Sequence, residues 1–135
     1  RAGELGLEDL QLFARWKSPR SAGHCTGNSD AYVRAVTRAS LSCAEPRFKI
    51  EVLRLLDGVD WPTASVILHF SDTDRWPVMD WRAFWSLKAK PPAGRYSFEL
   101  WWEYTNACRR LADDGGHDMR IVDRALWTYS KVKQR

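Results

Sequence analysis

The fold is decided by one stretch of fourteen residues, Leu55-Leu56-Asp57-Gly58-Val59-Asp60-Trp61-Pro62-Thr63-Ala64-Ser65-Val66-Ile67-Leu68. Apolar residues close one helix, Gly58 and Val59 make a tight turn, and a second helix of small and apolar residues follows. Asp60 and Pro62 are typical of a helix start, because Asp caps free backbone N–H groups and Pro fits the first turn. The stretch therefore predicts a helix-hairpin-helix over about residues 48–70. Because a helix N-terminus offers unpaired N–H groups and a favourable dipole, the second helix is a ready site for a phosphate.

The rest of the chain is also predicted to be helical, since no segment shows the two-residue alternation of a strand. The expected helices cover residues 5–16, 29–42, 46–57, 61–70, 81–87, 98–112 and 119–130. Their expected caps are Asn28 or Ser29, Asp60, Asp80, Ser97 and Asp118. Gly115 and Gly116 end the long helix, residues 88–95 form a connection, and residues 131–135 are expected to fray. The sequence predicts an all-α helical bundle in a single domain, residues 1–135, long enough for a real core.

The eight tryptophans are the unusual figure in the composition, and most are expected to lie in the core because large rings carry so much burial area. Trp101, Trp102 and Trp127 are predicted to be buried. Helical spacing also predicts apolar faces that point inward. These faces comprise Leu7, Leu10, Phe13, Ala14, Tyr32, Val33, Val36, Ala39, Phe48, Ile50, Val52, Leu53, Leu55, Leu56, Met119, Val122, Leu126 and Tyr129.

Charge and cysteine content narrow the class of protein. A net charge of +4 and a pI near 9.2 permit a polyanionic partner without requiring one. No apolar run reaches the length of a membrane span and no signal peptide opens the chain, so we expect no membrane partner. Three cysteines without a Cys-x-x-Cys pair favour reduced thiols in the cytoplasm and no zinc or iron–sulfur centre. We expect a monomer without a bound metal.

The turn and the aspartate that follows it carry a family resemblance. The pattern Leu-x-Gly-Val-x-x-x-x-Ala-Ser-x-Ile-Leu over residues 56–68, with Asp80 placed 18 residues after Pro62, resembles the helix-hairpin-helix DNA glycosylase superfamily. That group includes endonuclease III and the adenine and alkylbase glycosylases. The resemblance implies a DNA partner, a nucleoid-associated location and a phosphate held by residues of the hairpin. Those residues are Gly58, Val59, Asp60, Trp61, Pro62 and Thr63.

The resemblance also implies a chemistry. Breaking an N-glycosidic bond builds positive charge on the sugar, which a nearby carboxylate stabilises, and the base must first leave the stack. Asp80 matches the family's catalytic aspartate, which lies in the cleft between two helical lobes. Pro62 stands where bifunctional members carry a nucleophilic lysine, so a monofunctional glycosylase without lyase activity is expected. No cofactor is implied beyond a possible monovalent cation at the hairpin.

Three features depart from the family pattern. Asp60 replaces the third residue of the usual Gly-Val-Gly, and its carboxylate would face the phosphate. Glycosylases of this group usually exceed 200 residues, and this chain has 135. The cysteine quartet that many members carry near the C-terminus is absent.

Other side chains are candidates for a base pocket, each with a structural alternative. Asp80 itself is equally well explained as a helix N-cap. Cations and indoles can grip a phosphate or stack on an extruded base, and Arg82 could hold Asp80 ionised. The pocket candidates are Trp16, Lys17, Arg20, His69, Trp81 and Arg82. The alternatives are a core role for Trp16 with solvated cations beside it, and a hydrogen-bonded boundary position for His69.

Two other functions stay open at the level of sequence. The chain could be a non-catalytic DNA-binding module that keeps the hairpin and uses Asp80 only as a cap. It could also be a protein-interaction domain that has lost DNA binding through Asp60. Steep weakening of binding with salt would separate DNA binding from the last alternative, because phosphate contacts release counterions.

Overall fold

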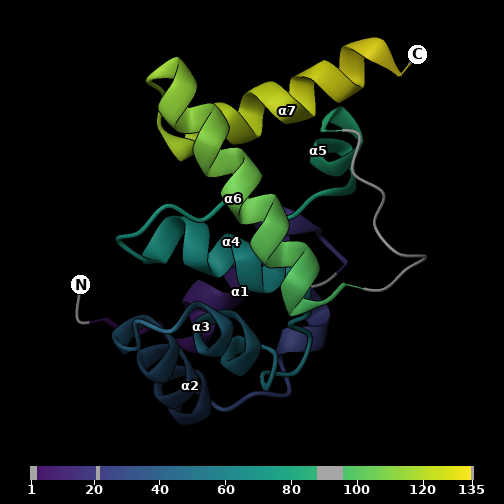
Figure 1. The fold of residues 1–135 in the computed structure, drawn as a ribbon. Coiled ribbons are helices and arrows are strands. Elements are labelled where there is room, and N and C mark those ends of the chain that lie inside the picture. Colours follow the sequence, from purple (N-terminus) through teal and green to yellow (C-terminus); the bar gives the residue numbers. More distant parts are fainter. Residues whose placement is uncertain (1–2, 21, 88–95, 135) are drawn as a thin grey trace. The chain divides into compact units, whose positions relative to one another are not determined.

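The computed structural model describes residues 3–20, 22–87 and 96–134, and this part of the chain is entirely helical (Figure 1). The predicted all-α class is confirmed for the described residues, which contain no strand. The elements are α1 (Leu7–Lys17), the 3-10 helix η1 (Ala22–Cys25), α2 (Asp30–Ser42), α3 (Pro46–Leu53), α4 (Trp61–Ser71), α5 (Trp81–Ser86), α6 (Phe98–Gly115) and α7 (Met119–Lys133). The connection predicted over residues 88–95 lies outside the described residues. None of the helices described is long and apolar enough to cross a membrane.

The chain divides into two compact units, residues 1–73 and residues 74–135. The first unit holds α1 to α4 with η1, and the second holds α5, α6 and α7. The single-domain organisation, the bundle architecture and the helix-hairpin-helix assignment stay predictions.

The first unit is built from helices that share one apolar core. Helix α4 packs on α1 and on α3, and α2 packs on α3. Residues that are completely or almost completely buried fill this core: Leu10, Val33, Ile50, Leu53, Leu56, Ile67 and Leu68. Helix α4 is buried on most sides, which suits its run of small and apolar residues.

A buried ion pair joins α3 to the end of α4. The Lys49 ammonium lies 3.2 Å from the Asp72 carboxylate, and both side chains are more than nine-tenths buried. The same ammonium donates to the carbonyl oxygen of Ser40 at 3.1 Å, and the Ser40 hydroxyl donates to the carbonyl of Lys49. Because a buried charge is costly without such partners, this network fixes the ends of α2, α3 and α4 together.

The second unit is organised around α7, which packs on both α5 and α6. Helix α6 ends at Gly116 in the left-handed conformation, and α7 begins three residues later (Figure 1). The segment before α5 is buried from Trp76 to Met79, and Trp76 stacks on Trp101 of α6 at 5.2 Å between ring centroids. This buried segment leads directly into Asp80.

Most helix ends lie where the sequence predicts them. Ser29, Asp60, Asp80, Ser97 and Asp118 are N-caps whose side chains accept a backbone N–H in the first turn. Two ends differ. Helix α3 stops at Leu53 and residues 54–58 form turns, because the chain must bend before the Gly58 turn. The predicted fraying of residues 131–133 is wrong, since α7 continues to Lys133.

Burial of the large rings is where the sequence prediction fails. Only Trp61, Trp76 and Trp101 are buried, whereas four other tryptophans are exposed: Trp16, Trp81, Trp85 and Trp127. The inward positions predicted for Tyr32, Phe48, Leu55, Trp127 and Tyr129 are also wrong, because each is at least 40% exposed. Helical spacing locates an apolar stripe, but it does not reveal which edge of the stripe a neighbouring helix covers.

Candidate nucleic-acid interface

The turn between α3 and α4 requires a glycine at its centre. Gly58 has a φ of 79°, in the left-handed region, and the N–H of Val59 donates to the carbonyl of Leu56 at 3.2 Å. A Cβ at Gly58 would lie 2.7 Å from the backbone carbonyl carbon of His24. Asn28 fixes the turn from the other side, since its amide exchanges two 2.9 Å hydrogen bonds with the backbone of Asp57. The turn is thus held in one conformation against the loop before α2.

The hydrogen bonds of this turn show which amides a phosphate would meet. The N–H of Trp61 donates to the Asp60 carboxylate at 2.8 Å, and the N–H of Ala64 donates to the Asp60 carbonyl at 2.9 Å. Pro62 has no N–H and Val59 uses its own within the turn. Of the six predicted phosphate-binding residues, Gly58, Asp60 and Thr63 therefore carry the N–H groups that an anion at this helix start would use.

The charge of Asp60 has a partner in the same turn. Its Oδ1 lies 3.1 Å from Nε of Arg54, and the Arg54 guanidinium also lies over the Trp61 ring at 4.7 Å from the centroid. Both charged side chains are exposed. The carboxylate that departs from the family pattern is therefore a helix cap paired with a cation, and the turn presents that cation beside its amides.

Two of the four predicted pocket residues in the first unit, Trp16 and His69, contact the ring of Phe70. Trp16 packs edge-on against Phe70 at 5.1 Å, and His69 packs edge-on against the same ring at 4.7 Å. Lys17 is the last residue of α1, and Arg20 lies exposed in the turn that follows. Trp16 is 49% exposed, so the alternative of a core position for this ring is wrong.

Asp80 is the N-cap of α5 and is partly buried. Its carboxylate accepts the backbone N–H of Arg82 at 2.8 Å, and its carbonyl accepts the N–H of Phe84 at 3.0 Å. The capping geometry is thus present in the second unit, whereas the Gly58 turn belongs to the first. The catalytic role of Asp80 and its proximity to the Gly58 amides stay predictions.

Trp81 and Arg82 meet the end of α7 in an open hollow of about 570 Å³, lined by Trp81, Arg82, Lys131 and Gln134. The Arg82 guanidinium lies 4.7 Å from the centroid of the Trp81 ring and 5.7 Å from that of Trp127. The Lys131 ammonium lies over the Trp127 ring, 4.8 Å from its centroid. We call these five residues the α5–α7 surface.

Sequence reasoning missed the contribution of α7 to this surface. Trp127, Lys131 and Gln134 are spaced at i, i+4 and i+7, which places them on one face of a helix. That spacing indicates a shared surface on this helix. The sequence prediction misses it because it places Trp127 in the core and treats the residues that follow as frayed.

Two buried, weakly acidic groups lie in α6. Burial raises the pKa of the Cys108 thiol to about 12, with a smaller contribution from the charge of Asp123. Burial also raises the pKa of Tyr104 well above its usual value, with smaller contributions from Cys108 and Asp123. Cys108 is therefore a protonated thiol at neutral pH and not a nucleophile, because the thiolate is the reactive form.

No protein family model, curated protein or solved structure matches this chain significantly. Function must accordingly be inferred from the geometry of the two units. Among the described residues, the Gly58 turn has a cation beside its backbone amides, and the α5–α7 surface has cations beside exposed rings.

Proposed function

We propose that the chain binds DNA through the Gly58 turn and acts as a monofunctional DNA N-glycosylase of the helix-hairpin-helix kind. The observation that carries the proposal is the turn itself. Its glycine is in the left-handed conformation, and the N–H groups of Gly58, Asp60 and Thr63 lie at the start of α4 with the cation of Arg54 beside them. Backbone amides of this kind hold a phosphate without reading sequence, as a protein that searches DNA for damage requires.

The proposed chemistry assigns one role to Asp80. Its carboxylate would stabilise the positive charge that develops on the sugar and orient the attacking water. Pro62 carries no amine that could attack the sugar, so the abasic product would be left uncut. A monovalent cation at the turn belongs to the same proposal, as does a monomer in the cytoplasm that associates with the nucleoid.

A second candidate function is a DNA-binding module without catalysis. The hydrogen bond from the Arg82 N–H to the Asp80 carboxylate favours it, because a capping role explains this residue without chemistry. The two candidates share the Gly58 turn and differ only in what Asp80 does.

DNA binding is tested with duplex affinity measured over a range of salt concentrations, where phosphate contacts make affinity fall steeply. Asp60→Asn keeps a capping side chain but removes the carboxylate charge beside the proposed phosphate. We expect it to bind duplex several-fold more tightly than the parent, whereas Asp114→Asn, with the same charge change at an exposed position on α6, leaves affinity near that of the parent. Salt-independent or undetectable binding would instead favour a protein-interaction domain.

Catalysis is tested by base release from a panel of duplexes that each carry one damaged base. Asp80→Asn should abolish release, while Asp118→Asn, the same change at the N-cap of α7, should retain it. Equal base release by Asp80→Asn and the parent would contradict a catalytic role for Asp80. The non-catalytic DNA-binding module would then be the remaining candidate. A covalent protein–DNA adduct trapped with borohydride would contradict the monofunctional assignment.

A further inference from the structure

The α5–α7 surface exposes aromatic rings that the fold does not need for its core. Trp81 is 53% exposed and Trp127 is 40% exposed, and Arg82 lies within cation–π distance of both rings. Large exposed rings next to cations are the usual platform for unpaired bases, because every base offers a face that stacks on an aromatic side chain. The pair of rings therefore favours a planar ligand.

The charge of the surface favours an anion. Among the described residues that line the hollow, two are cations and none is acidic, and Arg124 is exposed on α7 just before Trp127. The nearest acid in sequence, Asp80, directs its carboxylate to the N–H of Arg82 in its own helix. A ligand with phosphates is thus complementary to the rim, as in grooves that follow a nucleic-acid backbone.

The amide of Gln134 supplies the remaining polar group. Its Oε1 accepts a hydrogen bond from the Ser130 hydroxyl at 2.8 Å, and the residue lines the hollow. The volume of about 570 Å³ falls within the range of about 300–1,000 Å³ typical of small-molecule sites. Because the hollow is open, a nucleotide that is part of a longer strand can lie in it.

We propose that the α5–α7 surface binds an unpaired nucleotide of single-stranded nucleic acid, with its base stacked on Trp81 and its phosphates beside Arg82 and Lys131. This binding goes beyond the proposed function and does not depend on the Gly58 turn. A membrane is the competing partner for a helix with tryptophan and lysine, but an interfacial helix requires a broad apolar face. Here cations lie beside both rings, and polar groups line the hollow.

The proposal is tested with the full chain and a fluorescent thymidine oligonucleotide of about 16 nucleotides, a length within the reach of single-strand binding sites. We expect Trp81→Leu to weaken binding by about 10-fold or more, since the variant removes the ring on which the base stacks. Trp85→Leu is the matched control, because Trp85 is an exposed tryptophan of α5 that does not line the hollow. Circular dichroism establishes that both variants are folded.

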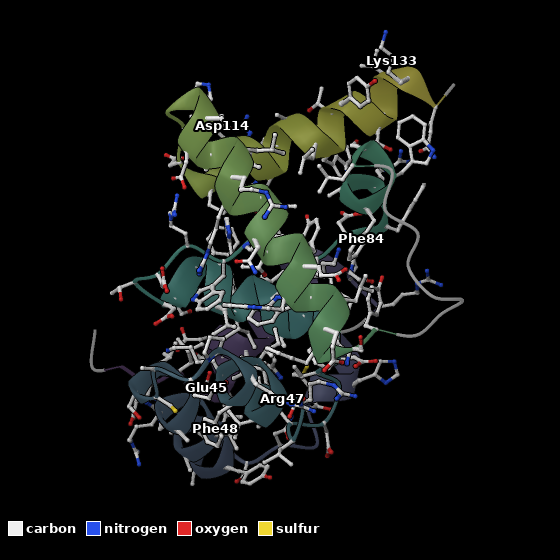
Figure 2. The ribbon with its side chains drawn as sticks, viewed as in Figure 1. Glu45, Arg47, Phe48, Phe84, Asp114 and Lys133 are labelled. Carbon is white, nitrogen blue, oxygen red and sulfur yellow. The ribbon has the colours of Figure 1, made fainter. Side chains whose placement is uncertain are left out.

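A second pair of variants tests the charge. Lys131→Gln should weaken binding several-fold more than Lys133→Gln, which removes the same charge from the same helix two residues away. Lys133 extends from the C-terminal end of α7 (Figure 2) and is not among the residues that line the hollow. Equal effects of the two lysine variants would show general attraction to a basic helix and overturn the specific site.

Three outcomes separate this inference from the proposed function. Asp60→Asn should tighten duplex binding at the turn and Trp81→Leu should weaken strand binding at the α5–α7 surface, so the two sites are measured independently. Equal binding by Trp81→Leu and Trp85→Leu would overturn the inference. Binding to phosphatidylserine vesicles without binding to the oligonucleotide would overturn it in favour of a membrane partner.

Discussion

The carboxylate of Asp123 accepts the backbone N–H of Val78 with both of its oxygens, at 3.1 and 3.2 Å, across 45 residues of sequence. Both residues are buried, and the Tyr104 hydroxyl donates to the carbonyl of the same Val78 at 2.8 Å. Side chains from α6 and α7 thereby satisfy both backbone groups of one residue. The extended segment that leads to Asp80 is held in place without any strand partner.

Removing this carboxylate should destabilise the second unit. Asp123→Ala leaves the buried N–H of Val78 without an acceptor, and we expect the free energy of unfolding to fall by about 2–3 kcal/mol. Asp123→Asn keeps one acceptor oxygen and should lose less. Urea unfolding followed by circular dichroism measures both, with Asp114→Ala, an exposed acid on α6 (Figure 2), as the control that should not change stability. An Asp123→Ala protein as stable as the control would contradict the role given to this carboxylate.

Gly58 and Gly116 both have a positive φ. Alanine substitutions at these two positions therefore distinguish the cost of backbone strain from the cost of steric overlap. Ala at Gly116 meets no heavy atom within 4 Å, so Gly116→Ala should cost only the left-handed conformation, about 1 kcal/mol. Ala at Gly58 would add an overlap with the backbone of His24 and Cys25, which cannot move aside as a side chain can. We therefore expect Gly58→Ala to lower the free energy of unfolding by at least about 2 kcal/mol, with overpacking added to the conformational cost. Equal losses of unfolding free energy in the two variants would mean that the loop before α2 moves away from the new methyl group at little cost.

The buried ion pair of Lys49 and Asp72 should show strong coupling. Lys49→Met leaves the Asp72 carboxylate buried without its cation, and we expect a loss of about 3 kcal/mol. Lys49→Met combined with Asp72→Leu should recover much of that loss, because a pair of apolar side chains avoids the desolvation of both charges. A double-mutant cycle of unfolding free energies measures the coupling. Additive losses would show that the two charges do not act as a pair.

Alkaline pH should weaken the second unit through Cys108. Its folded pKa of about 12 lies above the ordinary value of 9.0, so the unfolded chain releases this proton first as pH rises. Stability is fully present below pH 9 and falls as pH rises toward 12, with a slope near 1.4 kcal/mol per pH unit for one such group. Tyr104 adds to the fall above pH 10, because its folded pKa is raised in the same direction.

The measurement is urea unfolding in a reducing buffer at a series of alkaline pH values. Cys108→Ala should flatten the slope, even if it changes the stability at neutral pH. Cys43→Ala is the control, because Cys43 is only partly buried and should leave the slope as it is in the parent. An unchanged slope in Cys108→Ala would assign the pH dependence to other groups.

Local signals in the sequence predicted most of the secondary structure. The caps Ser29, Asp80 and Asp118 were identified because capping depends only on a side chain and the backbone within three residues of it. Gly116 was identified for a similar reason, since a left-handed helix end favours glycine. These features need no knowledge of the tertiary structure.

Burial and surface sites could not be predicted in the same way. Trp101 and Trp127 are both large rings on helices, yet the first is completely buried and the second is 40% exposed. The difference depends on which helix covers each ring, and that information is spread over the whole unit. The cation–π contact between Arg82 and Trp127 likewise joins residues 45 positions apart, so no local sequence pattern predicts it.

The hydrogen bond between Asp123 and Val78 has a consequence for the order of assembly on the ribosome. Val78 is synthesised 45 residues before Asp123, so a nascent chain that has emerged only as far as Gly116 contains Asp80 but not the carboxylate that holds the preceding segment. The buried segment before Asp80 and the hollow beside Trp81 can reach their final form only when α7 has been released from the exit tunnel. Any activity that resides in the second unit is thereby delayed until translation has passed α7.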